Sequence, residues 1–164
     1  MNLPTGVFKA QGQSSRQFDA KKELDILARD TFSGYLILST LSEIGVDEGA
    51  LLFRVGQGMG GVFEYHGVSK ILYGSESLPH VFNAMAAEHT VIDIVSLSLQ
   101  QVDLVMAFNG KLALSKPLSK GQFSPFIKPF DPQLIRTVLQ GTRPEESQSK
   151  ESLFKKFGLA GIGR

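Results

Sequence analysis

The stretch from Leu51 to Tyr65, LLFRVGQGMGGVFEY, separates two possible folds. Its centre, Gly56 to Gly61, matches the spacing G-x-G-x-x-G of dinucleotide-binding loops. Such a loop follows a strand and opens a helix, because the amides at the helix N-terminus bind the pyrophosphate. The residues after Gly61 instead alternate in a β-rich pattern without a helical stripe. The sequence therefore predicts a glycine-rich β-hairpin.

The composition favours one folded domain with a short appendage. The chain has 164 residues, of which 42% are hydrophobic, enough for a sizeable core. Lys and Arg number 17 and Asp and Glu number 16, a net charge of +1, which argues against a nucleic-acid-coating protein. There are no cysteines, so disulfides, thiolate metal sites and cysteine nucleophiles are excluded.

No targeting or membrane-spanning segment is evident in the sequence. The N-terminus, MNLPTGVFKAQGQSS, lacks the continuous apolar core of a secretory signal. No run approaches the roughly 18 apolar residues that cross a bilayer. These patterns predict a cytoplasmic protein without a transmembrane segment.

The order of hydrophobic patterns predicts an α+β fold, an antiparallel meander or hairpin sheet packed with about four helices. Strands are expected at 6–10, 33–41, 50–55, 61–67, 70–73 and 90–97. Helices are expected to begin at Asp19, at Ser75 or Ser77, at Ser98 and at Asp131, the last two ending at Phe108 and Gly141.

Three local structural predictions can be tested directly. The acidic, Gly-bearing segment Glu43 to Gly49 is predicted to be a turn. The helix from Ser98 opens with a capping box to Gln101 and is apolar around most of its circumference, so it should be well buried. Residues 116–129 should form an extended connection along the surface, because Phe123, Phe126 and the neighbouring Phe130 need cover.

The C-terminal part divides into a linker and a tail. A domain at 1–141 is followed by a polar linker at 142–150 and an amphipathic tail at 151–164, which a short helix would close. The residues predicted to bind a partner protein are Leu153, Phe154, Lys155, Lys156 and Phe157. If helical, the tail places its apolar residues on one face and its lysines elsewhere, as docking motifs do. Packing on its own domain and binding to an anionic membrane surface remain alternatives.

No catalytic, cofactor-binding or metal-ligating residue is predicted. His66, His80 and His89 lack metal-ligand spacing, and His66 and His89 are most simply solvated caps. Asp93 and Asp103 lie in apolar stretches and could carry shifted pKa values, although buried carboxylates usually just form hydrogen bonds.

The order of the glycine and leucine motifs resembles a known domain type. It runs from Gly34-x-Leu36-x-Leu38 through Gly49-x-Leu51-x-Phe53-x-x-Gly56 and a hairpin at Val62 to Gly74 before a helix with Leu78. This resembles the PATAN-type domain of unknown function, and more closely uncharacterised archaeal proteins that share this core and end in a Leu/aromatic–Lys–Lys tail. The resemblance spans roughly 18–98 plus the tail, with Ser77 where Ala would be expected.

The resemblance implies an α/β scaffold for protein–protein contacts without catalytic residues. The sequence thus favours a non-enzymatic interaction or signalling-scaffold module, and leaves a weak homo-oligomer open. One alternative is a small-molecule sensor that holds its ligand between the sheet and the helix carrying Phe82 and Met85. A second alternative is a protein that binds a nucleotide at the glycine-rich hairpin, although H-R-D and D-F-G motifs are absent.

Overall fold

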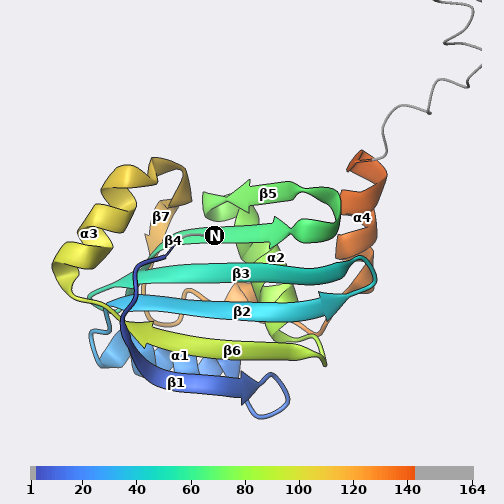
Figure 1. Ribbon diagram of the computed structural model, residues 1–164. Coiled ribbons are helices and arrows are strands. Elements are labelled where there is room, and N and C mark those ends of the chain that lie inside the picture. The colour runs from blue at the N-terminus through green and yellow to red at the C-terminus, as the bar shows by residue number, and fades with distance from the viewer. Residues whose placement is uncertain (1–2, 143–164) are drawn as a thin grey trace, which may run out of the picture. The chain divides into compact units, whose positions relative to one another are not determined.

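The computed structural model describes residues 3–142, in which the chain forms seven strands and four α-helices (Figure 1). The strands are β1 (Val7–Ser14), β2 (Gly34–Ser42), β3 (Gly45–Arg54), β4 (Gln57–Tyr65), β5 (Lys70–Tyr73), β6 (Thr90–Ser96) and β7 (Ala113–Leu118). The α-helices are α1 (Ala20–Arg29), α2 (Leu78–Met85), α3 (Leu99–Phe108) and α4 (Pro132–Thr142). Short 3-10 helices are η1 (His66–Val68), η2 (Gly74–Ser77), η3 (Gly110–Leu112) and η4 (Ser124–Phe126).

The chain divides into two compact units, Met1–Asp131 and Pro132–Arg164. The first contains the whole sheet with α1, α2 and α3. The second contributes only α4 to the described residues, and this helix starts at the predicted proline and continues through Gly141. Most of the predicted linker and all of the predicted tail lie outside the described residues.

The sheet is antiparallel throughout, in the order β1-β6-β2-β3-β4-β5. The outer edge of β4 is shared, because β5 pairs with Val62 to Tyr65 and β7 pairs near Gly58 and Gly60. At the other edge, the pairing of β1 with β6 is interrupted twice by irregularities between Phe8 and Gln13. The predicted α+β class with an antiparallel sheet is confirmed.

The β3–β4 hairpin turns through Val55 and Gly56, and Arg54 pairs with Gln57. Both turn residues have positive φ, 50° and 76°, as a two-residue hairpin turn with the right-handed twist of its strands requires. A side chain at Gly56 would collide with the carbonyl of Ala28 at the end of α1. Glycine is therefore needed here for its backbone conformation and for space.

The other glycines of the run belong to β4 and not to a ligand loop. β4 carries one extra residue, Met59, because Leu52 pairs with Gly60 while Phe53 pairs with Gly58. A Cβ on Gly61 would strike the hydroxyl of Ser77, so this position lets η2 pack directly on the strand. The residues from Gly61 to Tyr65 continue as strand, and the helix that would hold a pyrophosphate does not begin there.

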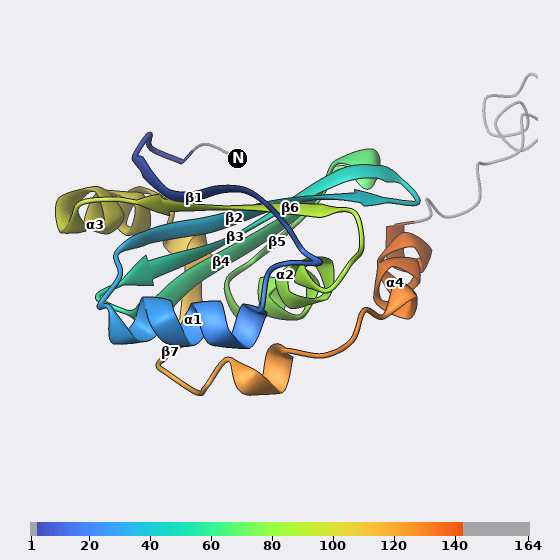
Figure 2. The same ribbon diagram turned by 90° about the horizontal axis from the view of Figure 1, so that it is seen from below.

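Helices α1 and α2 cover one face of the sheet, which we call the inner face (Figure 2). The amphipathic α1 is capped by Asp19, which accepts from the Lys22 amide at 3.0 Å, and buries Leu24 and Leu27. Helix α2 buries Val81 and Phe82, and Phe82 lies close to the buried Phe123 and stacks on Phe126 of η4. This layer is the larger part of the core.

Helix α3 covers one end of the opposite, outer face. Its capping box between Ser98 and Gln101 is confirmed. Of its residues only Val102 and Val105 are buried, and they pack in a cluster that includes Tyr35. The prediction of a well-buried helix is wrong: Leu104 is 54% exposed and Phe108 83% exposed, because the helix presents a single stripe to the sheet.

Two further expectations need correction. Only Glu43 and Ile44 form the turn between β2 and β3, because the pairing runs on to Ser42 opposite Gly45. The segment predicted to be a turn therefore contributes five residues, 45–49, to β3. The connection after η3 begins with a strand, β7, that was not predicted. Phe130, which was expected to need cover, stays 42% exposed.

Candidate functional site at one end of the sheet

A row of polar side chains crosses the inner face at the strand ends. The register places Thr90 of β6 opposite Thr40 of β2, Thr40 opposite Asp47 of β3, and Asp47 opposite Tyr65 of β4. All four side chains are buried. The Thr90 hydroxyl lies 2.7 Å from both the Thr40 hydroxyl and the carbonyl of Ala84 in α2, so the row also anchors that helix.

Asp47 is the unusual member of this row. It is 0% exposed, and neither carboxyl oxygen has a hydrogen-bond partner among the described residues. Burial raises its pKa, because a low-dielectric interior disfavours the charged form. The Ser42 hydroxyl and His66 lower the pKa but do not outweigh burial. Nothing in the local sequence marks this residue, since its segment resembles a turn.

Tyr65 and His80 form a hydrogen-bonded pair beside Asp47. The Tyr65 hydroxyl lies 2.7 Å from Nδ1 of His80, and the two rings meet edge to face. Burial, with the charge of Lys70, lowers the pKa of His80 to about 4. The imidazole is therefore neutral near pH 7, and the tautomer sets which of the Tyr65 hydroxyl and Nδ1 donates the hydrogen bond. Burial and the nearby Asp47 raise the pKa of Tyr65, so its hydroxyl stays protonated.

The same strand ends carry a second cluster on the outer face, formed by Glu48, Glu64 and His66. Glu48 and Glu64 stand directly opposite each other on β3 and β4. Nε2 of His66 lies 3.2 Å from Oε2 of Glu48, and its Nδ1 lies 3.5 Å from Oε1 of Glu64. These residues can each offer one ligand atom, all within 4.8 Å of one another. Sequence spacing missed this cluster because only the hairpin register brings it together.

The residues that the sequence singled out are dispersed. His66, predicted to be a solvated cap, is exposed but paired, whereas His80 contacts Tyr65 on the inner side. Asp103 is not in apolar surroundings: it is exposed and binds Arg54 through two oxygens, at 2.7 and 3.2 Å. The hydrogen bond from Arg54 lowers the pKa of Asp103. Asp93 accepts a hydrogen bond from the Gly12 amide at 2.6 Å.

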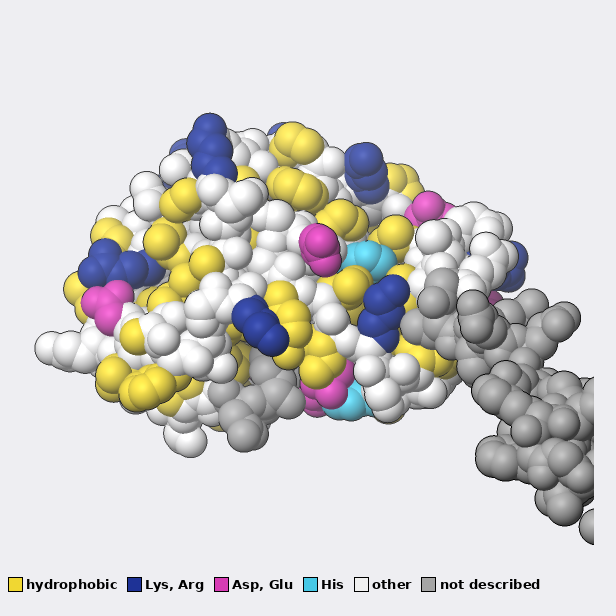
Figure 3. Space-filling view, turned by 90° about the horizontal axis from the view of Figure 1, so that it is seen from above, with side chains coloured by type: hydrophobic (Ala, Val, Ile, Leu, Met, Phe, Trp, Pro, Cys, Tyr) yellow, Lys and Arg dark blue, Asp and Glu magenta, His cyan; other side chains and the backbone are white. Residues whose placement is uncertain are grey.

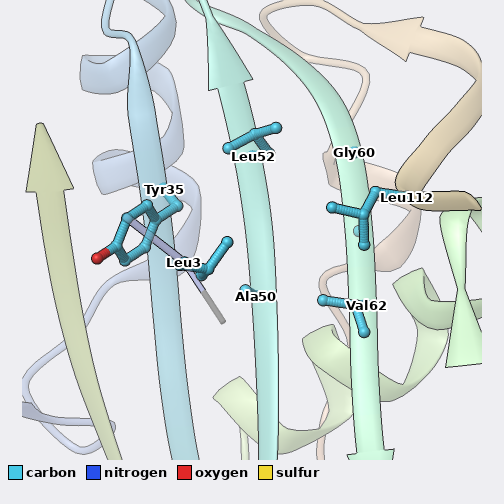
Figure 4. A pocket seen from close by; sticks show the side chains of 8 residues that line it. Leu3, Tyr35, Ala50, Leu52, Gly60, Val62 and Leu112 are labelled. Atoms are coloured by element: carbon cyan, nitrogen blue, oxygen red, sulfur yellow. The ribbon is translucent and has the colours of Figure 1, made fainter. Parts of the chain in front are cut away.

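A small apolar pocket lies on the outer face beside α3 (Figure 4). Its volume is about 200 Å³, part of which is open to solvent. It is lined by Leu3, Tyr35, Ala50, Leu52, Gly60, Gly61, Val62 and Leu112. The position predicted for a sensor's ligand is different, and there Phe82 and Met85 are themselves buried in the core.

The half of the outer face farther from α3 carries no helix in the first unit, and Figure 1 looks onto it. We call this surface the open outer face. By strand alternation it comprises Ile37, Ser39, Leu41, Val46, Glu48, Glu64, Ile71, Val91 and Asp93. Leu41, Val46, Ile71 and Val91 are all exposed. An apolar surface with an acidic component therefore adjoins the pocket.

The five predicted partner-binding residues, Leu153 to Phe157, lie outside the described residues. None of the helices in the described part of the chain is long and apolar enough to span a membrane. On the edge view of Figure 3, the Lys and Arg side chains stand apart from one another and form no continuous basic patch.

An antiparallel sheet with helices on its inner face and a half-covered outer face defines the class of the protein, an α+β domain. The chain belongs to a family of uncharacterised proteins conserved in archaea, DUF2226, which matches residues 1–109. The match runs from β1 through α3 and includes both polar clusters. No curated protein and no solved structure matches the chain. The resemblance to uncharacterised archaeal proteins is thereby confirmed.

Proposed function

We propose that the protein is a non-enzymatic protein-interaction module whose partner docks on the open outer face. The observation that carries the proposal is the set of exposed apolar side chains, among them the cross-strand pair Leu41 and Val46, on a sheet face whose other half is covered by α3. Contiguous exposed apolar surface is typical of interaction sites. The partner is expected to present apolar side chains flanked by Lys or Arg, because Glu48, Glu64 and Asp93 share this face.

The apolar pocket supports the same proposal by offering an anchor point. Interfaces concentrate their binding energy in a few large side chains that fill desolvated pockets. The pocket adjoins the open outer face through Ala50 and Val62 and is lined by apolar residues and glycine. The enclosed part of the pocket is small, so it would accept only the tip of one apolar side chain of the partner, while the remaining contacts would spread over the open outer face.

The absence of enzymatic activity is part of the proposal. The buried polar row holds the groups that could exchange protons, but Asp47 and Tyr65 are closed off beneath α2. The pocket, in turn, is lined by apolar residues and glycine apart from Tyr35, whose hydroxyl donates a hydrogen bond to the Pro4 carbonyl. Catalysis needs reactive groups and a pocket for the substrate in one place. Among residues 3–142, the buried polar row and the apolar pocket lie on opposite faces of the sheet.

The PATAN resemblance and the tail extend the proposal. A PATAN-like scaffold would place the module in a signalling assembly. The tail from Leu153 to Phe157 would then provide a second contact to the same partner, tethered beyond the polar linker. Two linked contacts bind more tightly than either alone, because the second one forms at a high effective concentration.

The test compares two exposed apolar sites. A partner is captured by cross-linking, identified by mass spectrometry, purified and titrated against Leu41→Asp, Val46→Asp and the control Leu104→Asp. Leu41 and Val46 are cross-strand neighbours on the open outer face, and Leu104 is similarly exposed on α3. We expect the first two variants to lose at least roughly tenfold in affinity. An equal loss in Leu104→Asp would reject the assignment of this face.

The contribution of the tail is tested separately. A chain ending at Gly141 should bind the same partner more weakly while keeping its sensitivity to Val46→Asp. If this shortened chain keeps the full affinity, the tail has no docking role and the sheet face alone remains.

A small-molecule sensor is the second candidate, and the pocket is the observation that favours it. Because the pocket is apolar, its ligand would be a hydrophobic molecule held by burial rather than by hydrogen bonds. A thermal-shift screen with apolar compounds, repeated on Ala50→Leu to fill the pocket, tests this alternative. If a compound stabilises the wild type and Ala50→Leu equally, it does not bind in the pocket.

A further inference from the structure

We propose that Glu48, Glu64 and His66 bind a divalent transition-metal ion, such as Zn²⁺, on the outer face. Glu48 and Glu64 also belong to the open outer face, but this inference rests on the geometry of the cluster and does not require the proposed docking of a partner. Carboxylate oxygens and imidazole nitrogen are ordinary ligands for Zn²⁺, and three protein ligands leave a position for water or for a group from another molecule.

The three side chains lie close enough together to share one ion after one of the glutamates rotates, because His66 now contacts the two glutamates through opposite ring nitrogens. Ligands bound about 2.0–2.2 Å from a tetrahedral ion lie roughly 3.3–3.6 Å from one another. The two nitrogen–oxygen distances at His66 are 3.2 and 3.5 Å. One ring nitrogen would bind the ion, and the glutamate facing the other nitrogen would rotate toward it. One ligand atom from each of the three residues can be chosen so that the three lie within 4.8 Å of one another, so only side-chain torsions need to change.

The scaffold holds these ligands in place. Glu48 and Glu64 are fixed by the antiparallel pairing of β3 and β4, and His66 begins η1 immediately after β4. Sites on regular elements keep their ligands more rigidly than sites on loops. The three side chains are half-buried or exposed, so an ion can reach them from solvent.

Electrostatics also favours a cation here. Like charges that face each other directly across two strands destabilise a sheet. The side chains of Glu48 and Glu64 occupy such a pair, and His66 lies between their carboxylates. A protonated His66 would supply one positive charge, whereas a divalent ion would supply two and also satisfy the imidazole nitrogen. The cluster can therefore be a hydrogen-bonded ion triad or a metal site, and the two differ in what they bind.

The experiment uses the full chain freed of metal with a chelator. Zn²⁺ is titrated calorimetrically, and Co²⁺ is used as a spectroscopic probe of the coordination. We expect one ion per chain at micromolar concentration, with shifts of the amide signals of Glu48, Glu64 and His66 in NMR spectra. Glu48→Gln and His66→Gln should each weaken binding by roughly tenfold or more.

The matched control is His89→Gln, which removes an exposed histidine in the loop before β6. It should bind like the wild type, and all variants should show wild-type circular dichroism because the substituted side chains are not in the core. The proposal is overturned if the wild type does not bind Zn²⁺ at these concentrations. It is also overturned if His66→Gln binds as tightly as His89→Gln.

Discussion

Asp47 shows how the surroundings of one residue can make stability depend on pH. Its carboxyl group is buried without a hydrogen-bond partner among the described residues, and burial raises its pKa. The folded state therefore holds this proton more tightly than the unfolded chain does. The stabilisation from Asp47 is complete below its unfolded pKa of about 3.9 and is lost as pH rises through the folded pKa. Near neutral pH the residue consequently weakens the fold.

Replacement of Asp47 by asparagine should remove this loss. We expect Asp47→Asn to raise the free energy of unfolding near pH 7.5 by about 1 kcal/mol or more, with a smaller effect near pH 4.5. Urea unfolding followed by circular dichroism at both pH values measures the difference. Glu76→Gln removes a carboxylate at an exposed position and serves as a control, which should alter the free energy of unfolding by less than about 0.5 kcal/mol. A variant that is less stable than the wild type at the higher pH would contradict the assignment.

The β3–β4 turn gives a prediction at the level of a single element. Gly56 and Gly121 share a positive φ of 76° and 78°, but only at Gly56 would a Cβ collide with another part of the chain, the Ala28 carbonyl. Gly121→Ala should therefore cost about 1 kcal/mol for the backbone conformation alone. Gly56→Ala should cost roughly 1–3 kcal/mol more because of the collision. Thermal or urea unfolding of both variants tests this, and equal losses would mean that α1 moves away freely.

Helix α3 gives a second prediction at this scale, because its buried and exposed apolar residues should behave differently. Val102→Ala removes a fully buried side chain and should cost about 2 kcal/mol. Phe108→Ser changes an exposed position and should alter the free energy of unfolding by less than about 0.5 kcal/mol. Equilibrium unfolding of both proteins checks the contrast. A large loss in Phe108→Ser would show that this face is covered in solution.

The same elements show what local sequence could predict. The N-cap at Asp19, the Ser98–Gln101 capping box and the glycine hairpin follow from short-range chemistry, and they were correct. The burial of α3 depends on how much of the helix the sheet can cover, which its own residues do not encode. The segment 45–49 was predicted to be a turn because it is acidic and contains glycine. It is a strand because it pairs with 38–42 of β2 and, from Asp47 onward, with 63–65 of β4.

At the scale of the molecule, the first unit should fold without the second. Residues Met1–Asp131 form one compact unit that contains every strand of the described sheet. A chain ending at Asp131 should therefore unfold in one cooperative transition and keep the β-rich circular dichroism of the full chain. A broad, non-cooperative transition would mean that the sheet needs residues from the second unit.

The candidate site could be predicted from the sequence only in part. The sequence correctly predicted a β-hairpin at the glycine run, and it singled out His66 without its partners. Glu48, Glu64 and Asp47 meet their neighbours through the register of β3 with β4, and alternation along the strands sends Asp47 inward and Glu48 outward. That separation depends on the pairing of β3 from Gly45 onward, whereas this strand was predicted to begin only at Ala50.

The irregular first strand has a consequence for the protein among its neighbours. β1 is the long edge of the sheet, and its pairing with β6 is broken between Phe8 and Gln13. Such interruptions bend and twist an edge, so a passing chain finds no long straight run of free amides and carbonyls to add to. The irregularity thus disfavours the addition of further strands at this edge and growth of the sheet into fibrils. Without it, the exposed apolar Val7 and Phe8 would favour such addition.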